Sequence, residues 1–218
     1  MEKKAERYIR EHSTPEDEVL AELFRQTHLY VVNPNMASGH LQGKLLEMIS
    51  HMIQPSYALE IGTYTGYSAI CLARGLKPGG ELHTIESNDE LNEMSSRYIT
   101  LAGVTDRVIQ HTGRAQDIIP TLDCTFDLVF IDGDKREYSE YYDLVFDRVR
   151  KGGFIIADNV LWGGKIDTEE AMKDPQGNGI VMFNEKIRND DRVEKLILPL
   201  RDGLMIIRRK EGGTVFDR

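Results

Sequence analysis

The 218-residue chain has few cysteines, and its two, Cys71 and Cys124, do not form a Cys-x-x-Cys pair. This scarcity argues against a disulfide framework and against a thiolate zinc site. No apolar run approaches the roughly 20 residues that a membrane-spanning helix needs. The first seven residues, MEKKAER, lack the apolar stretch of a signal peptide. We therefore expect a soluble, cytoplasmic protein with no membrane partner.

Positive charge is also in short supply, because 27 Lys and Arg stand against 36 Asp and Glu, a net charge of −9. A large nucleic-acid-binding face is disfavoured, since phosphate attracts positive surfaces. A local basic patch near residues 1–10 and 188–195 stays open. Hydrophobic residues make up 40% of the chain and charged residues 29%, which is ordinary globular composition without repeats. The length fits one domain.

The first 55 residues read as a helical segment that belongs to the same domain as the rest of the chain. We expect this segment to cap the substrate and to contribute to a dimer interface. Thr14, followed by Pro15 and two acids, predicts a helix start with Thr14 as N-cap. A second helix is expected to begin near Ser38-Gly39 and to end at Gln54-Pro55.

Residues 56–210 read as an α/β catalytic domain, because short apolar runs alternate there with amphipathic stretches. The Lys151-Gly152-Gly153 segment is expected to form a turn. After a helix near 178–189, Arg201-Asp202-Gly203 separates two apolar runs and predicts a closing antiparallel hairpin. Residues 211–218 read as a flexible tail. The strands are expected at 57–61, 81–85, 107–111, 126–131, 153–157, 192–200 and 204–209, and the intervening helices at 66–76, 89–102, 115–122 and 137–149.

Two glycines, Gly62 and Gly66, follow the first expected strand, and Glu86 ends the second. In open α/β sheets ligands bind beyond the carboxyl ends of the strands, where glycine permits close approach and an acid can bind ribose hydroxyls. The spacing matches neither GxGxxG nor a phosphate-binding Gly-Lys-Ser/Thr loop. A plain strand–helix turn with a solvated Glu86 is the alternative.

Glu60 lies inside an otherwise apolar strand, where a carboxylate is costly to bury without a partner. The partner could be a buried arginine or the ammonium group of a ligand. A glycine turn that need not hold a pyrophosphate, beside such an acid, favours S-adenosylmethionine over NAD.

Oxygen ligands gather at the ends of two later strands, in Asp132, Asp158 and Asn159. Adjacent parallel strands would bring them together, and two carboxylates with an amide suit Mg²⁺, with Ca²⁺ or Mn²⁺ as substitutes. Capping of loops and helices is the alternative. Lys135 lies close by, and a neighbouring cation would favour its neutral amine as a base, although it could be an exposed lysine. Asp134 could contact the cofactor or cap a helix.

Six segments together resemble the metal-dependent class I O-methyltransferases, the group of catechol and caffeoyl-CoA O-methyltransferases. They are LEIGTYTGYSA (59–69), HTIES (83–87), GRAQDIIPTL (113–122), VFIDGDKREY (129–138), GGFIIADNVLWGG (152–164) and LPLRDGLMIIRR (198–209). The resemblance implies a Rossmann-like fold with a seven-stranded, mostly parallel sheet, an antiparallel C-terminal hairpin and helices on both faces. It also implies a homodimer.

The resemblance further implies roles for individual residues. Lys135 and Asp132 would be catalytic, Asp132, Asp158 and Asn159 would bind the metal, and Met36 would lie near the methyl donor. Apart from the resemblance, Trp162 directly follows the metal segment, and with Met36 it could form a substrate wall. The residues expected at the S-adenosylmethionine site are Met36, Glu60, Gly62, Tyr64, Ser68, Glu86, Gly113, Ala115, Gln116, Asp132 and Asp134.

The expected reaction is methylation of one hydroxyl of a catechol-like small molecule. A tRNA hydroxyuridine O-methyltransferase of the same fold is the alternative, and an NAD-binding Rossmann protein is a more distant one. Trp162 could stack on the substrate or lie in the core.

Overall fold

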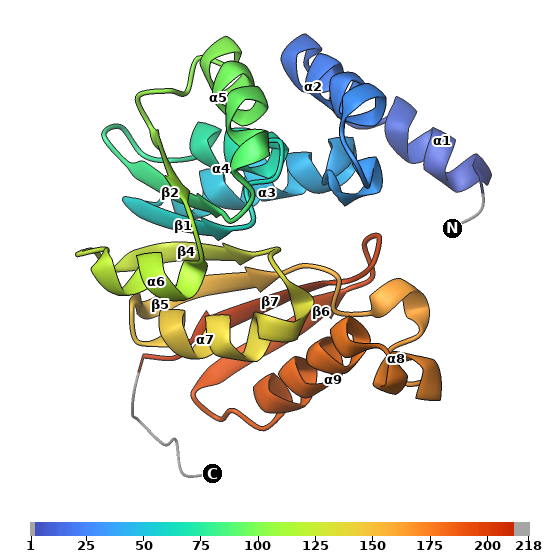
Figure 1. The fold of residues 1–218 in the computed structure, drawn as a ribbon, viewed down its shortest axis with the longest axis vertical. Coiled ribbons are helices and arrows are strands. Elements are labelled where there is room, and N and C mark those ends of the chain that lie inside the picture. Colours follow the sequence, from blue (N-terminus) through green and yellow to red (C-terminus); the bar gives the residue numbers. More distant parts are fainter. Residues whose placement is uncertain (1–2, 212–218) are drawn as a thin grey trace.

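The computed structural model describes residues 3–211 and shows helices packed on both faces of one sheet (Figure 1). The expected tail lies outside these residues, apart from Glu211. No helix in the described part of the chain is long and apolar enough to cross a membrane.

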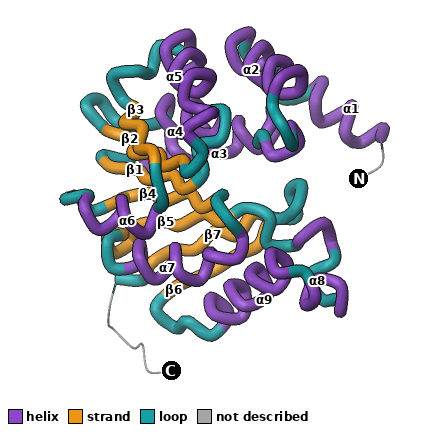
Figure 2. The backbone as a smooth tube through the Cα atoms, in the orientation of Figure 1, coloured by secondary structure: helices purple, strands orange, loops and turns teal. Residues whose placement is uncertain are grey.

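Seven strands form a single sheet in the order β3-β2-β1-β4-β5-β7-β6 (Figure 2). Strands β1 to β5 run parallel, whereas β7 pairs antiparallel with both β5 and β6. This confirms the seven-stranded fold and its C-terminal hairpin. The strands are β1 (Tyr57–Ile61), β2 (Glu81–Glu86), β3 (Val108–Thr112), β4 (Phe126–Ile131), β5 (Val149–Ala157), β6 (Val193–Leu198) and β7 (Leu204–Arg209).

Two apolar clusters hold helices against the two faces of the sheet. One face packs against α2 (Glu18–Tyr30), α3 (Gly39–Ile53), α4 (Tyr67–Arg74) and α5 (Asn92–Leu101). The other packs against α6 (Ala115–Ile118), α7 (Tyr138–Phe146) and α9 (Pro175–Arg188). Strands buried on both sides explain why the sequence shows continuous apolar runs rather than alternation.

Shorter helices complete the chain. They are α1 (Lys3–Glu11), α8 (Glu169–Lys173) and the 3₁₀ turns η1 (Pro34–Met36), η2 (Asp89–Leu91), η3 (Ile119–Thr121), η4 (Lys135–Glu137) and η5 (Trp162–Gly164).

The expected helix start at Thr14 is wrong. Helix α2 begins at Glu18, and its N-cap is Asp17, whose Oδ1 accepts a hydrogen bond of 2.9 Å from the Leu20 amide. A short acidic side chain three residues before an amide donor serves this role as well as threonine does.

The expected turn at residues 151–153 is also wrong, because this segment lies within β5. Gly152 has φ +75°, and the pairing of β4 with β5 shifts between Phe126 and Leu128. The glycine therefore lets the strand bulge and continue. As a result β5 begins at Val149, and α7 stops at Phe146 rather than at 149.

The sheet order reverses between β1 and β4, which lie side by side although β2 and β3 separate them in sequence. The chain continues from β1 to α4 on one face of the sheet and from β4 to α7 on the other. A crevice therefore opens beyond the carboxyl ends of these two strands. Gly62 follows β1 and Asp132 follows β4, which places both at this crevice.

Candidate active site

A cavity of about 1170 Å³ opens at the reversal point of the sheet. Its walls come from the ends of β1, β2, β4 and β5, from the segment around η1 and from the β6–β7 turn. Of the residues expected at the site, it is lined by Met36, Gly62, Tyr64, Glu86, Gly113, Ala115, Gln116, Asp132, Asp134, Lys135, Asp158, Asn159 and Trp162. Glu60 and Ser68 are not in the lining.

Backbone hydrogen bonds continue the sheet ladder past the strand ends. The Asp132 amide donates to the Ile61 carbonyl (2.8 Å) and the Asp158 amide to the Ile131 carbonyl (3.0 Å). These two bonds hold both aspartates at the same edge of the sheet. The two aspartates therefore lie at the same sheet edge, as the strand order predicts.

Gly62 leaves its strand with φ +103°. A Cβ placed on it would lie 2.5 Å from the Asp132 carbonyl oxygen, too close for any side chain. Gly66, with φ +93°, is the N-cap of α4. The turn after β1 therefore needs Gly62 both for its conformation and for close approach to the β4 chain.

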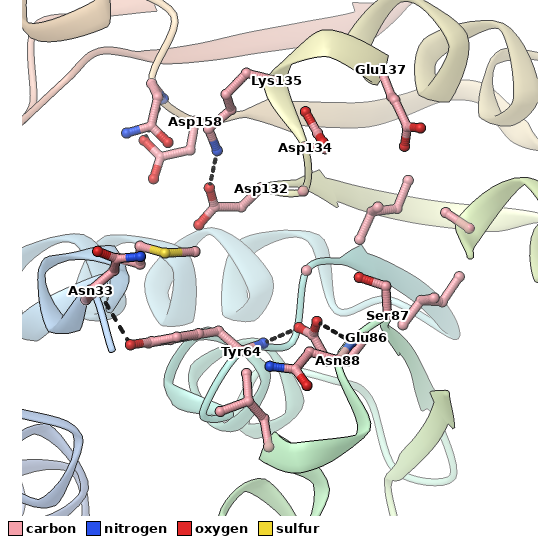
Figure 3. A pocket seen from close by; sticks show the side chains of 18 of the residues that line it. Asn33, Tyr64, Glu86, Ser87, Asn88, Asp132, Asp134, Lys135, Glu137 and Asp158 are labelled. Atoms are coloured by element: carbon pink, nitrogen blue, oxygen red, sulfur yellow. Dashed lines mark hydrogen bonds and ion pairs between the residues drawn. The ribbon is translucent and has the colours of Figure 1, made fainter. Parts of the chain in front are cut away.

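Glu86 is held by the backbone on both carboxylate oxygens. Its Oε2 accepts from the Tyr64 amide (2.8 Å) and its Oε1 from the Asn88 amide (2.9 Å), as Figure 3 shows. A carboxylate has about four acceptor positions, so two remain for a ligand in the cavity.

Glu60 is fully buried, and its partner is not an arginine. Its Oε2 accepts from the Thr84 hydroxyl (2.6 Å), whereas its Oε1 has no hydrogen-bond partner within the described residues. Burial raises the pKa of Glu60 to about 8. The unpartnered oxygen is the one observation at Glu60 that fits a ligand, and Ser68 lies close enough to act on its pKa.

Lys135 and the two aspartates form the opposite side of the cavity from Tyr64 and Glu86 (Figure 3). The Lys135 amine donates to Asp132 Oδ1 (2.6 Å) and to the Tyr138 hydroxyl (2.8 Å). Asp158 is buried, and burial, together with the charge of Asp132, raises its pKa to about 6. The alternative of an exposed lysine is wrong, because only 13% of the Lys135 side chain is accessible.

Asp134 combines the two roles that the sequence left open. It lines the cavity, and its Oδ1 accepts from the Arg136 amide (3.0 Å) as the cap of η4. The hydrogen bond and ion pair with the Arg136 guanidinium hold the pKa of Asp134 below its ordinary value. Trp162 likewise lines the cavity while packing against the core cluster beside α9.

The described residues contain no group of three or more His, Cys, Asp and Glu side chains placed to hold a metal ion. Asp132, Asp158 and Asn159 offer two carboxylates and one amide at the cavity wall. Asn159 adopts φ +60°, and its Nδ2 lies 3.4 Å from Asp202 Oδ2.

Sequence reasoning missed several residues at this site, above all Gln42, Arg201 and Asp202. Gln42 donates to Asp158, and Arg201 and Asp202 line the cavity from the β6–β7 turn. Gln42 carried no signal, because one polar residue in an amphipathic helix is unremarkable. The Arg201-Asp202-Gly203 pattern predicts a hairpin turn, and nothing in it indicates a cavity wall.

A family model described as O-methyltransferase matches residues 10–210. A catechol O-methyltransferase from Niastella koreensis is 36% identical over 173 residues, covering 78% of this chain and 75% of the relative. A caffeoyl-CoA O-methyltransferase from Mesembryanthemum crystallinum is 32% identical, covering 80% and 73%. The crystal structure of the O-methyltransferase TomG from Streptomyces achromogenes, in complex with SAM, superposes with a TM-score of 0.89 at 33% identity, covering 96% of this chain and 99% of that one.

Proposed function

The chain belongs to the O-methyltransferase family, and from this premise we propose that it transfers the methyl group of S-adenosylmethionine to a hydroxyl of a catechol-like small molecule, with a divalent metal ion. The observation that carries the proposal is the cavity itself. One wall has a glycine turn and a backbone-held acid, and the other has two aspartates and an asparagine beside a lysine.

Several features support a cofactor site along β1 and β2. Gly62 brings the backbone close, and Glu86 keeps acceptor positions for ribose hydroxyls. The unpartnered Oε1 of Glu60 is an acceptor that a nearby ammonium group would satisfy, directly or through water. We therefore assign cofactor binding to the cavity-lining residues Met36, Gly62, Tyr64, Glu86, Gly113, Ala115, Gln116, Asp132 and Asp134. Glu60, with Ser68 beside it, would act on the cofactor from behind this lining.

The donor set of Asp132, Asp158 and Asn159 fits a hard divalent cation such as Mg²⁺, with Ca²⁺ or Mn²⁺ as substitutes. The two carboxylates lie close enough that the charge of Asp132 raises the pKa of Asp158. A bound divalent ion would favour the ionised form of a chelated hydroxyl and fix its orientation.

We assign the role of general base to Lys135. A phenol has a pKa near 10, so its ionisation at pH 7 costs roughly 4 kcal/mol. In its neutral form the Lys135 amine would accept the hydroxyl proton. The phenolic oxygen then forms a bond to the methyl carbon as the carbon–sulfur bond breaks, and the electron pair returns to sulfur. The proton leaves Lys135 for water. Tyr138 and Asp132 hold the amine in position from two sides.

The charge of the cavity favours a neutral or cationic acceptor over a polyphosphate ester such as a CoA thioester. Seven acidic residues line it, Glu86, Glu90, Asp132, Asp134, Glu137, Asp158 and Asp202, against three basic ones, Arg114, Lys135 and Arg201. The three cations already have partners: Glu137 for Arg114, Asp132 for Lys135, and main-chain carbonyls for Arg201. Such a cavity suits a sulfonium and a metal ion.

The two basic segments of the tRNA alternative do not lie side by side. Helix α1 lies beside α2 in the upper half of the view, whereas α9 lies in the lower half (Figure 1). Arg188 pairs with Glu185 at 3.1 Å and Arg192 with Asp190 at 2.6 Å. Local neutralisation leaves little attraction for a phosphate backbone.

A cytoplasmic homodimer completes the proposal. Both cysteines are free, as a reducing compartment would leave them. Exposed apolar side chains on α3 and β6 (Met48, Met52, Leu196 and Ile197) offer surface for a second copy. Sedimentation at several concentrations measures the oligomeric state.

The test is a methyl-transfer assay with labelled S-adenosylmethionine across catechols, caffeoyl-CoA and hypomodified tRNA, each with Mg²⁺ and with EDTA. We expect transfer to catechols only, and loss of that transfer in EDTA. Transfer that persists in EDTA would remove the metal from the proposal. Transfer to tRNA that falls steeply with salt would establish the alternative.

A further inference from the structure

Gln42 is a buried polar side chain in the first turn of α3, with 1% of its surface exposed. Its Nε2 donates to Oδ2 of Asp158 at 2.7 Å, across 116 residues of sequence. Gln42 does not line the cavity, so any effect on the reaction must pass through Asp158.

Each oxygen of the Asp158 carboxylate therefore receives one hydrogen bond from the protein. Oδ2 accepts from Gln42, and Oδ1 accepts from the Asn159 amide at 2.7 Å. Two donors on opposite oxygens fix the rotation of the carboxylate and leave its remaining acceptor positions for the cavity.

The other end of the Gln42 amide meets Arg201, in the turn between β6 and β7. Nη1 of Arg201 lies 3.4 Å from Gln42 Oε1. An arginine only donates and an ionised carboxylate only accepts, so the amide between them has one satisfied orientation. Its NH₂ group must face Asp158.

Arg201 also holds η1 and the two residues after it. Its guanidinium donates to the carbonyls of Asn35 (3.0 Å), Ala37 (2.9 Å) and Ser38. Its own backbone has φ +49°, a conformation that a non-glycine residue keeps only when its surroundings hold it. The contacts of Arg201 thus join the β6–β7 turn, the wall of the cavity and the support of Asp158.

We propose that Gln42 is a positioning residue that orients Asp158 for the divalent cation, and that Arg201 holds Gln42 in the required orientation. The inference rests on the proposed function, in which Asp158 is a metal ligand. Hydrogen bonds that orient metal ligands commonly change metal affinity by about 10- to 100-fold when removed. A purely structural role for Gln42 would change stability and leave metal affinity unmoved.

The first test is a titration of the metal-free protein with Mn²⁺. The signal of free Mn²⁺ in electron paramagnetic resonance measures how much of the ion is bound. Gln42→Met keeps the length of the side chain and removes both polar ends. We expect Mn²⁺ affinity to fall about tenfold, with S-adenosylmethionine affinity measured by calorimetry unchanged. Ser50→Ala is the matched control, because Ser50 is a buried hydrogen-bonding residue of the same helix that bonds the Leu72 carbonyl.

Arg201→Ala provides a second, exposed variant that decides the question if Gln42→Met does not fold. We expect a smaller loss of Mn²⁺ affinity, about threefold, since the 3.4 Å contact is the weaker one. Arg209→Ala is its control: Arg209 is also a hairpin arginine that holds carbonyls, those of Phe146 and Val149, away from the cavity.

Asp158→Ala distinguishes a failure of the proposed metal site from a failure of the positioning role of Gln42. If this variant binds Mn²⁺ as tightly as the wild type, the proposed metal site fails. If Asp158→Ala loses Mn²⁺ while Gln42→Met and Arg201→Ala keep wild-type affinity, the metal site stands and the positioning role is overturned.

Discussion

The Nζ atom of Lys135 lies 2.6 Å from Oδ1 of Asp132. The proposed base and a proposed metal ligand are thus in direct contact, within the turn that follows β4. A cation bound at Asp132 would compete with Lys135 for this oxygen. The amine, still held by the Tyr138 hydroxyl at 2.8 Å, would then be free to meet an acceptor hydroxyl.

Replacement of Lys135 by methionine tests the base. Loss of a positioned general base lowers the rate by about 10²- to 10⁴-fold, so we expect kcat of Lys135→Met to fall in that range. Cofactor affinity, measured by calorimetry, should change little. Lys186→Met is the control, because Lys186 also pairs with an aspartate, Asp143, and lies over a tyrosine ring, but outside the cavity. Wild-type kcat in Lys135→Met would exclude the proposed role.

Glu86→Gln tests the ribose contact. The substitution removes the charge that strengthens hydrogen bonds to the cofactor, and such bonds contribute about 1.5–3 kcal/mol each. We expect S-adenosylmethionine to bind about 10- to 100-fold more weakly in calorimetry. Glu81→Gln, at the opposite end of the same strand, should bind it as the wild type does. Equal affinities in the two variants would contradict the assignment.

Gly62→Ala tests the close approach of β1 to β4. The added Cβ would meet the Asp132 carbonyl oxygen at 2.5 Å, so both the strained φ of +103° and the overlap act against it. Gly79→Ala has the strained φ, here +74°, but no overlap, because nothing lies within 4 Å of a Cβ at that position. In urea unfolding we expect Gly62→Ala to be less stable than Gly79→Ala by about 1–3 kcal/mol, with cofactor binding reduced. Equal stabilities would show that the turn relaxes freely.

The raised pKa of Glu60 makes the free energy of unfolding depend on pH. Its pKa of about 8 in the folded state exceeds the ordinary 4.5 because of burial. Between these values the folded protein binds one more proton than the unfolded chain, so this group lowers the free energy of unfolding as pH rises. The limiting slope is about 1.4 kcal/mol per pH unit. Glu60→Gln removes this contribution.

The measurement is the difference in unfolding free energy between Glu60→Gln and the wild type from pH 5 to 9. We expect the free energy of unfolding of Glu60→Gln to rise relative to that of the wild type up to about pH 8. Above that pH the difference should level off. Glu194→Gln, at an exposed strand position paired with Arg208, should show no such trend. A flat difference for Glu60→Gln would mean that the carboxylate is ionised in the folded protein.

The strand–helix alternation and the hairpin could be predicted because each leaves a local pattern. Buried parallel strands show as short apolar runs, and Asp202-Gly203 forms the turn that joins β6 to β7. The limits of elements were less predictable. The glycine pair at 152–153 predicts a turn, yet pairing with β4 carries β5 through it, because tertiary hydrogen bonds outweigh local preference.

The candidate site was predictable where residues follow strand ends, because a parallel sheet collects those ends at one edge. Gly62, Asp132 and Asp158 are examples. The sequence could not reveal that Glu60 and Ser68 stay outside the cavity wall, since burial depends on how α4 packs.

The sequence by itself determined the order of the elements, the family and the chemical types present at the strand ends, because these depend on local pattern and composition. The tertiary structure alone decided which side chains meet. It brought Gln42 of the first helical segment to Asp158, and Arg201 of the last hairpin to both Gln42 and the η1 segment. Contacts across more than a hundred residues leave no local pattern, because they depend on how two folded elements pack and not on the residues beside them.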